Sequence, residues 1–240
     1  MSLATSGFIL LGLACAGLAV AKDNAPPKLA LIGDSTVCKY PESGLMRGWG
    51  HMLPEFLADG VGVMNEARGG LSTKTFPRDR WQAILSARPD YVLIQFGHND
   101  SHARGLPEST DAKTDYKDNL RRFLSEARAA GVEPVLVTPP RRRLFLPNGT
   151  LTNELAPYAE AMKDVARETT TRLIDLHELS RRRYAELGEA GSAAFTVNKV
   201  DQADRPGQDD RTHFTVTGAR EMAALVAGEL TVIDPSLTRR

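Results

Sequence analysis

Four short stretches of the chain carry groups that could carry out acyl transfer together. Gly33-Asp34-Ser35-Thr36 places a serine beside a glycine, directly after an apolar run, where a tight turn can expose the hydroxyl. Gly69-Gly70 can let backbone N–H groups approach a ligand closely, because glycine has no side chain in the way. Gly97-His98-Asn99-Asp100 contains an asparagine whose amide can donate to a developing oxyanion. Each of these three stretches, taken alone, is also typical of an ordinary turn or helix cap.

The fourth stretch, residues 210–213, contains Asp210 and His213. On one tight loop this spacing lets the carboxylate hold the imidazole in a single tautomer, while the other ring nitrogen faces a nucleophile. Asp209 is the rival carboxylate, one residue further from His213. An Asp-x-x-His pattern alone usually marks a surface turn, so the case for catalysis depends on the four stretches together.

Alternating strands and helices must position these groups. Apolar runs predict five strands, and amphipathic or helix-favouring stretches between and after them predict six helices. The expected strands are residues 28–32, 61–64, 91–96, 132–137 and 172–176. The expected helices are residues 48–58, 80–87, 115–130, 153–169, 178–187 and 217–230. The alternation predicts an α/β fold, with a doubly wound five-stranded parallel sheet between helices in a flavodoxin-like three-layer sandwich. In such sheets the site lies at the carboxyl ends of the strands, where the first three stretches stand.

The order of the four stretches resembles the SGNH hydrolase superfamily, also called GDSL esterases, from Lys28 to about Leu230. Finer motifs resemble its rhamnogalacturonan acetylesterase branch: Gly48-Trp49-Gly50, Asn65-x-Ala67, residues 72–76, residues 94–100, and His213-Phe214 followed by Gly218-Ala219. One difference is Leu71, at a position where that branch often has arginine.

The resemblance implies a serine esterase with an acyl-enzyme intermediate and no cofactor. Ser35 would be the nucleophile, His213 the general base and then the acid, and Asp210 the residue that orients His213. The backbone N–H groups of Ser35 and Gly70 and the side-chain amide of Asn99 would form the oxyanion hole. The Gly-x-Ser-x-Gly nucleophile elbow is absent from the sequence, which disfavours the α/β-hydrolase fold.

Three further residues are candidate substrate contacts. They are His98 beside Asn99, Trp49, which could stack on a sugar or pack in the core, and Arg141 in a run of three arginines. Arginine suits bidentate recognition of a uronate carboxylate, although a run of arginines more often marks a solvated surface. His98 and His102 have the spacing of a helical zinc pair, but they follow a strand and lack the His-Glu-x-x-His pattern, so we expect no metal site.

Composition limits the partners. The chain has 240 residues with 30 basic and 30 acidic side chains, so its formal net charge is zero. A nucleic-acid partner is disfavoured, because binding it needs a cationic surplus. Neutrality does not exclude an anionic polysaccharide, since an arginine run can make a local patch. We expect an acetylated polysaccharide or oligosaccharide as substrate and a monomeric protein.

The N-terminus resembles a secretory signal peptide. Residues 1–21 are uncharged, contain an apolar run and end in Ala19-Val20-Ala21, a small-x-small cleavage pattern. A retained membrane anchor is the alternative, although the run is short for a span. We therefore expect a signal peptide at 1–21, a linker at 22–27, one domain at 28–235 and a frayed tail at 236–240. The mature protein would be secreted or periplasmic, free of the membrane, and would keep one cysteine, Cys38.

The leading hypothesis is a secreted esterase that removes O-acetyl groups from a plant pectic polysaccharide, rhamnogalacturonan first. One alternative is an SGNH esterase that acts on acetylated xylan or on small aryl or lipid esters. A non-catalytic carbohydrate-binding protein on the same scaffold is another, and a metal-dependent hydrolase is the last.

Overall fold

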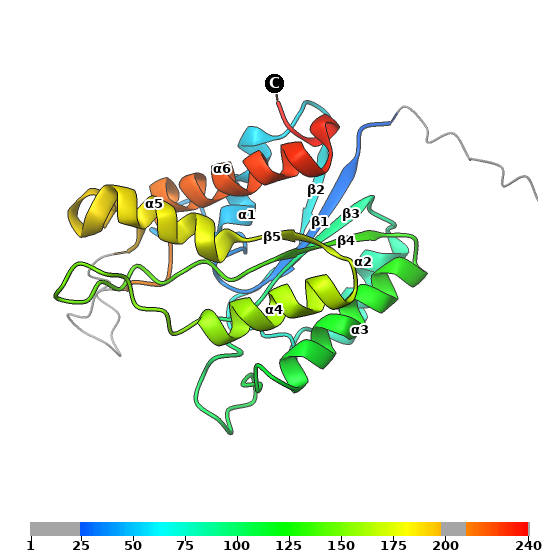
Figure 1. Ribbon diagram of the computed structural model, residues 1–240. Coiled ribbons are helices and arrows are strands. Elements are labelled where there is room, and N and C mark those ends of the chain that lie inside the picture. The colour runs from blue at the N-terminus through cyan, green and yellow to red at the C-terminus, as the bar shows by residue number, and fades with distance from the viewer. Residues whose placement is uncertain (1–24, 198–209, 240) are drawn as a thin grey trace, which may run out of the picture.

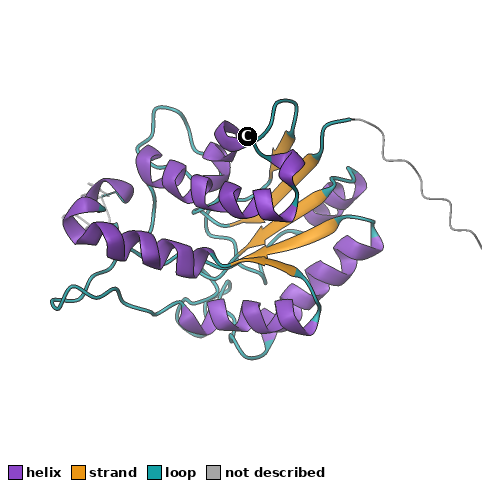
Figure 2. Ribbon diagram, turned by 45° about the horizontal axis from the view of Figure 1, so that its top comes forward, coloured by secondary structure: helices purple, strands orange, loops and turns teal. Residues whose placement is uncertain are grey.

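The computed structural model describes residues 25–197 and 210–239. The sheet has five strands: β1 (Lys28–Gly33), β2 (Gly62–Asn65), β3 (Tyr91–Gln95), β4 (Glu133–Val137) and β5 (Arg172–Ile174). Their order is β2-β1-β3-β4-β5, and every neighbouring pair is parallel. Figure 2 shows the strand arrows all running in one direction between two layers of helices. The predicted α/β sandwich is confirmed.

The helices form two layers, one on each face of the sheet (Figure 1). One layer contains α1 (Trp49–Met52), α5 (Leu176–Gly191) and α6 (Val216–Ile233). The other contains α2 (Arg78–Ser86), α3 (Asp115–Ala129) and α4 (Ala156–Glu168). Alternation along the strands divides the core accordingly: Leu29 and Leu31 of β1 pack under the first layer, and Ala30 and Ile32 pack under the second.

The predicted helix at residues 48–58 is shorter than expected. It divides into α1 and a 3-10 turn, η1 (Leu53–Phe56), because Pro54 lacks a backbone N–H and cannot continue the α-helical ladder. Helix α5 begins two residues before its predicted start and continues past Leu187 through a kink at Gly188, whose φ of +67° glycine tolerates. A further 3-10 turn, η2 (Ala193–Phe195), follows it.

The expectation of a frayed C-terminal tail is wrong for the residues that the structure describes. The 3-10 turn η3 (Pro235–Leu237) buries Leu237 completely, and the Arg239 guanidinium donates to the carbonyl oxygen of Leu57 at 2.9 Å. The segment therefore covers the end of η1. The expected signal peptide and residues 22–24 of the expected linker lie outside the described residues.

The strand order fixes where a ligand can bind. β1 lies between β2 and β3, so the crossovers that leave β1 and β3 go to opposite sides of the sheet. A crevice opens at such a switch point, outside the carboxyl ends of the strands. Residues 34–36 follow β1, and residues 97–100 follow β3 after Phe96. Within the described ranges, no helix is both long and apolar enough to cross a membrane.

Candidate active site

Ser35, His213 and Asp210 form a continuous hydrogen-bonded chain. His213 Nε2 lies 2.9 Å from Ser35 Oγ, and His213 Nδ1 lies 2.6 Å from Asp210 Oδ2. A carboxylate can only accept, so Nδ1 carries the proton in this pair and Nε2 is free to accept from the serine hydroxyl. The three side chains thus have the polarity that removal of a proton from Ser35 requires.

The Asp210 carboxylate also holds the loop that carries Asp210 and His213 in place. Asp210 Oδ1 accepts from the backbone N–H groups of Thr212 and His213, both at 2.9 Å. Burial pushes the pKa of Asp210 up, but the hydrogen bonds from the His213 ring and from these backbone groups outweigh it, so the pKa is below its usual value. Asp210 is therefore ionised at neutral pH, as a residue that stabilises an imidazolium must be. Asp209, the rival carboxylate, lies outside the described residues.

Ser35 stands on a turn that is fixed from beneath. The backbone N–H groups of Val37 and Cys38 both donate to the carbonyl oxygen of Asp34 at 3.1 Å. Asp34 is fully buried, and its Oδ1 accepts from the backbone N–H and the hydroxyl of Thr36, at 2.8 and 2.7 Å. Tyr40 Oη donates to the carbonyl oxygen of Ser35 at 3.0 Å. Asp34 thus fixes the turn on which Ser35 stands.

The glycine loop lies against Ser35. A Cβ atom added to Gly69 would lie 3.7 Å from Ser35 Cβ. Gly70 has φ +78°, a left-handed conformation that L side chains rarely adopt, which explains a glycine at this position. Asn99 Nδ2 donates to the carbonyl oxygen of Leu71 at 2.8 Å. An amide nitrogen has two hydrogens, so this bond orients the Asn99 side chain and leaves one donor for a ligand.

His98 lies beneath the site. Its side chain is almost fully buried, and Nδ1 is 3.5 Å from Asp34 Oδ2, too far for a well-formed hydrogen bond. Burial is the largest influence on His98 and lowers its pKa, so the ring is neutral. Any contact of His98 with a substrate would be limited to the small exposed edge of its ring.

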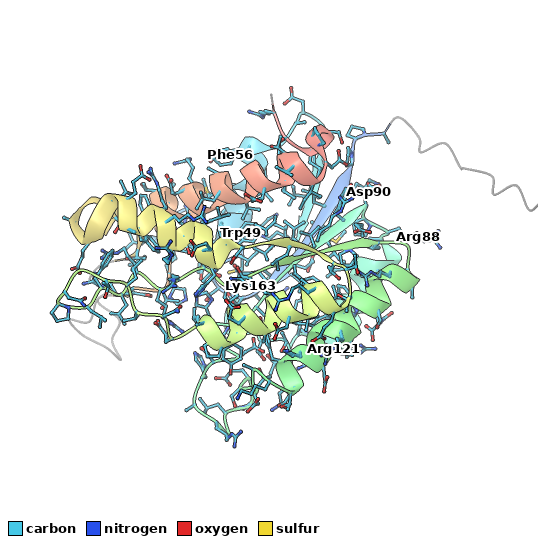
Figure 3. All side chains as sticks on the ribbon, in the orientation of Figure 1. Trp49, Phe56, Arg88, Asp90, Arg121 and Lys163 are labelled. Atoms are coloured by element: carbon cyan, nitrogen blue, oxygen red, sulfur yellow. The ribbon has the colours of Figure 1, made fainter. Side chains whose placement is uncertain are left out.

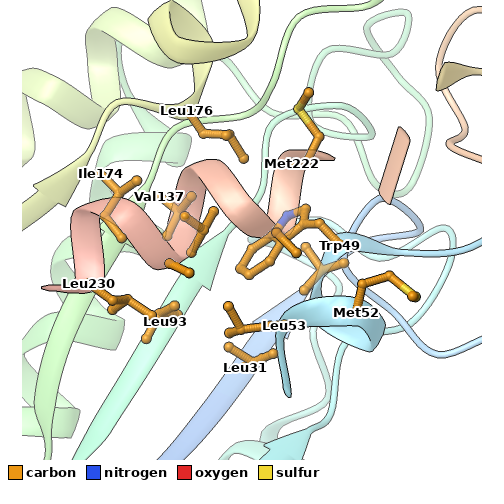
Figure 4. Packing of buried hydrophobic residues seen from close by; sticks show 14 of the residues in the cluster. Leu31, Trp49, Met52, Leu53, Leu93, Val137, Ile174, Leu176, Met222 and Leu230 are labelled. Carbon is orange, nitrogen blue, oxygen red and sulfur yellow. The ribbon is translucent and has the colours of Figure 1, made fainter. Parts of the chain in front are cut away.

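The expected sugar contact of Trp49 is wrong. Trp49 has no exposed surface, and it packs between the sheet and the helix layer of α6 with Leu31, Leu53 and Met222 (Figure 4). Figure 3 labels Trp49 among all the side chains of the molecule. Its indole Nε1 donates to Gln95 Oε1 at 2.7 Å. Trp49 therefore supports the strand ends from inside the core and cannot stack on a ligand.

The arginine run is divided by the fold. Arg141 donates to the carbonyl oxygen of Thr152 at 2.8 Å. The charged groups that act on it most strongly are Arg181 and Glu178 of α5. Arg143 is buried and donates to the hydroxyl of Thr196 at 2.9 Å. Arg142 instead contacts the hydroxyl of Thr212, next to His213, and its charge lowers the pKa of His98 after the larger effect of burial. The member of the run that stands at the site is Arg142, which the sequence did not distinguish from Arg141.

One further sequence feature concerned metal binding, the spacing of His98 and His102. His102 does not form a helical pair with His98: it lies in a turn, and its Nδ1 is 2.7 Å from Glu108 Oε1. In the ranges 25–197 and 210–239, no cluster of three or more His, Cys, Asp or Glu side chains is arranged to hold a metal ion.

A separate hollow of about 1150 Å³ lies beside the loop that follows β3. Its walls come from most of residues 102–117, from α4 as far as Asp164, and from Lys74, which follows the glycine loop. Neither Ser35 nor His213 lines it. The chemical groups are thus at the strand ends, and this hollow provides space next to the loops that carry Gly70 and Asn99.

Comparison with known proteins gives one family. Residues 31–221 match the GDSL-like lipase/acylhydrolase family. A probable rhamnogalacturonan acetylesterase of Bacillus subtilis, YesY, is 38% identical over 87% of this chain and 94% of its own. The rhamnogalacturonan acetylesterase RhgT of the same organism is 39% identical over 84% of this chain and 88% of its own.

Solved structures agree on the fold. The protein YxiM of Bacillus subtilis superposes with a TM-score of 0.72 at 27% identity, over 87% of this chain and 57% of that one. An acetylxylan esterase of Geobacillus stearothermophilus, Axe2, superposes with a TM-score of 0.63 at 21% identity, over 85% of this chain and 94% of that one. At that identity the second likeness concerns the fold alone.

Proposed function

The chain belongs to the GDSL-like lipase/acylhydrolase family and is an ester hydrolase, and from this premise we propose that it removes O-acetyl groups from a pectic polysaccharide, rhamnogalacturonan first. The observation that carries the proposal is the Ser35–His213–Asp210 chain at the switch point of the sheet. The substrate is inferred from two relatives named rhamnogalacturonan acetylesterases, which match most of this chain.

In the proposed mechanism Ser35 Oγ attacks the acetyl carbonyl carbon while His213 Nε2 takes the hydroxyl proton. The carbonyl π electrons move to oxygen, and the oxyanion accepts hydrogen bonds from the backbone N–H groups of Ser35 and Gly70 and the second amide hydrogen of Asn99. Collapse breaks the bond to the sugar oxygen, which leaves with the proton from His213. Water then attacks the acetyl-enzyme while His213 Nε2 takes its proton, and collapse breaks the bond to Ser35 Oγ, which regains the proton from His213 as acetate leaves.

The charge next to the site favours a uronate-containing substrate. Arg142 contacts Thr212 beside His213, and its Nε is 3.4 Å from Glu154 Oε1. Its side chain is 24% exposed, so a carboxylate from solvent can reach it in competition with Glu154. We propose that Arg142 takes the role that the sequence assigned to Arg141.

Acetate release from a panel of acetylated rhamnogalacturonan, acetylated xylan and a neutral aryl acetate tests the proposal. We expect the rhamnogalacturonan to be the best polymer and Ser35→Ala to abolish release from all three substrates. Full acetate release by Ser35→Ala would overturn the mechanism and revive a metal-dependent hydrolase or a binding protein with contaminating activity. Preference for xylan would overturn the substrate but leave the mechanism standing.

A pair of arginine variants tests the uronate contact. Arg142→Gln should raise KM for the uronate polymer several-fold and leave kcat/KM for the neutral aryl acetate within about twofold. Arg141→Gln is the matched control, because it belongs to the same run but faces α5. Equal effects of the two variants on the polymer would contradict the assignment.

We also propose that the protein is exported, with residues 1–21 removed as a signal peptide. The support is the uncharged apolar run that ends in Ala19-Val20-Ala21. N-terminal sequencing of the protein recovered from the periplasm or medium should begin at Lys22. Recovery of the full-length chain in the membrane fraction would instead favour a retained anchor.

A further inference from the structure

Asp100 is a buried carboxylate that the proposed mechanism does not use. It follows Asn99 directly and has no exposed surface. Its Oδ1 accepts from the backbone N–H of Thr73 at 3.1 Å, from the Thr73 hydroxyl at 2.5 Å and from the Thr110 hydroxyl at 3.1 Å. Burying a carboxylate is costly unless it is hydrogen-bonded, and these bonds offset part of that cost.

The carboxylate joins the two loops that supply the expected oxyanion donors. Thr73 lies three residues after Gly70, on the loop that passes Ser35, and Asp100 lies next to Asn99. Asn99 itself donates to Leu71 of the same loop. The side chains of Asn99 and Asp100 thus both bind residues 71–73, the amide at the Leu71 carbonyl oxygen and the carboxylate at Thr73.

Asp100 is anchored on its other side by the second helix layer. Its carbonyl oxygen accepts from the backbone N–H of Thr110 at 3.0 Å and from Tyr158 Oη of α4 at 2.9 Å. Tyr158 Oη also contacts the carbonyl oxygen of Thr110 at 2.5 Å. Asp100 is therefore a fixed point from which the glycine loop is held.

We propose that Asp100 is a positioning residue, whose carboxylate sets the distance between the Gly70 N–H and the Asn99 amide by holding residues 71–73. The proposal rests on the proposed function, because it concerns the oxyanion hole of that site. Asp100 touches neither substrate nor the reacting atoms. It acts through the placement of two donors, and a displaced donor loses much of its effect on turnover.

The charge of Asp100 adds a pH dependence. Burial raises its pKa to about 7, against the lowering effect of the bonds from Thr73 and Thr110, and the charge of Asp34 raises it further. The titratable groups facing Asp100 are Asp34 after β1, Tyr116 of α3 and Tyr158 of α4. An ionised carboxylate accepts more strongly than a carboxylic acid. The loop is thus held more tightly above about pH 7 than below it.

The test compares variants on a neutral aryl acetate, so that it does not depend on the polymer. Asp100→Asn and Thr73→Val should lower kcat about tenfold to a hundredfold with KM changed less than about twofold. Thr73→Ser keeps the hydroxyl and should restore kcat to within about threefold of the unchanged protein. Thr110→Val is the matched control: it removes one hydroxyl from the same oxygen but does not touch the glycine loop, so its kcat should stay within about threefold.

The pH profile supplies a readout that a loss of stability would not give. In the unchanged protein kcat should fall with decreasing pH more steeply than protonation of a single group predicts, because Asp100 and the general base both take up a proton. In Asp100→Asn the fall should match protonation of a single group. If Thr110→Val lowers kcat as much as Thr73→Val, or if Asp100→Asn leaves kcat and its pH profile unchanged, the proposal is overturned. Residual hydrolysis by Ser35→Ala would instead show that the proposed mechanism has failed, independently of Asp100.

Discussion

Replacing Asp210 by asparagine should reverse the tautomer of His213 without moving the loop. The side-chain oxygen of the asparagine can still accept from the two backbone N–H groups that Asp210 Oδ1 accepts from, at 2.9 Å each. The amide nitrogen, however, would now donate toward His213 Nδ1, where Oδ2 accepts at 2.6 Å. A ring that accepts at Nδ1 carries its proton at Nε2, and Nε2 can then no longer accept from Ser35 Oγ.

The expected size of the effect follows from what is lost. The general base is in the wrong protonation form and its cation has no counter-charge, which in a Ser-His-Asp arrangement lowers kcat by about 10⁴. At about 1.4 kcal/mol per factor of ten this is about 5.5 kcal/mol of transition-state stabilisation. Folding should change little, because the side chain keeps its shape and two of its bonds.

The assay is steady-state hydrolysis of an aryl acetate by Asp210→Asn, with thermal unfolding measured in parallel. Asp209→Asn is the matched control, since it removes the neighbouring charge and should leave kcat within about twofold. Activity of Asp210→Asn within tenfold of the unchanged protein would refute the reasoning. So would an equal loss in Asp209→Asn, which would assign the role to the other carboxylate.

Three further outcomes are expected. Because burial raises the pKa of Asp100 to about 7 from its usual 3.8, the folded protein keeps this proton where the unfolded chain has released it. Its contribution to stability therefore falls as pH rises from about 4 to 7, by at most about 4 kcal/mol, and Asp100→Asn should flatten that part of a denaturant-unfolding series. Trp49→Phe leaves Gln95 Oε1 without its 2.7 Å indole donor and should cost about 1–3 kcal/mol in unfolding free energy with KM for the polymer unchanged; a large rise in KM would restore the sugar contact. Gly70→Ala meets no atom within 4 Å, so only its φ of +78° opposes it; we expect about 1–2 kcal/mol lower stability and less than a tenfold loss in kcat, against which a hundredfold loss would count.

The sheet was predictable because its three central strands, β1, β3 and β4, are buried along most of their length and appear as apolar runs, such as residues 91–94 of β3. Parallel strands also bring their carboxyl ends to one edge, so residues after β1 and β3 had to be neighbours. The pairing of Ser35 with His213 needed more, because it depends on where α6 docks. The order of the motifs, and not any single spacing, predicted it.

What the sequence could not give is the direction in which a side chain points. Trp49 is an aromatic residue near the site whether it faces a sugar or Gln95, and only the packing of α6 on α1 decides between them. Arg141 and Arg142 are adjacent and chemically identical, and contacts with α5 and with Thr212 separate them. Asp100 belongs to a stretch that the motifs included, but its partners Thr73 and Thr110 lie on two other segments.

The long separation between Ser35 and His213 also sets when the protein can first act. The two residues are 178 positions apart, and the base stands just before α6, whose Gly218 lies so close to Phe195 that an added Cβ would be 1.9 Å from its carbonyl oxygen. During synthesis the nucleophile emerges early, while its partner emerges only after all five strands have been made. A nascent chain that still lacks residues 210–213 therefore cannot form the Ser35–His213–Asp210 hydrogen-bonded chain, so we expect no activity before α6 has docked.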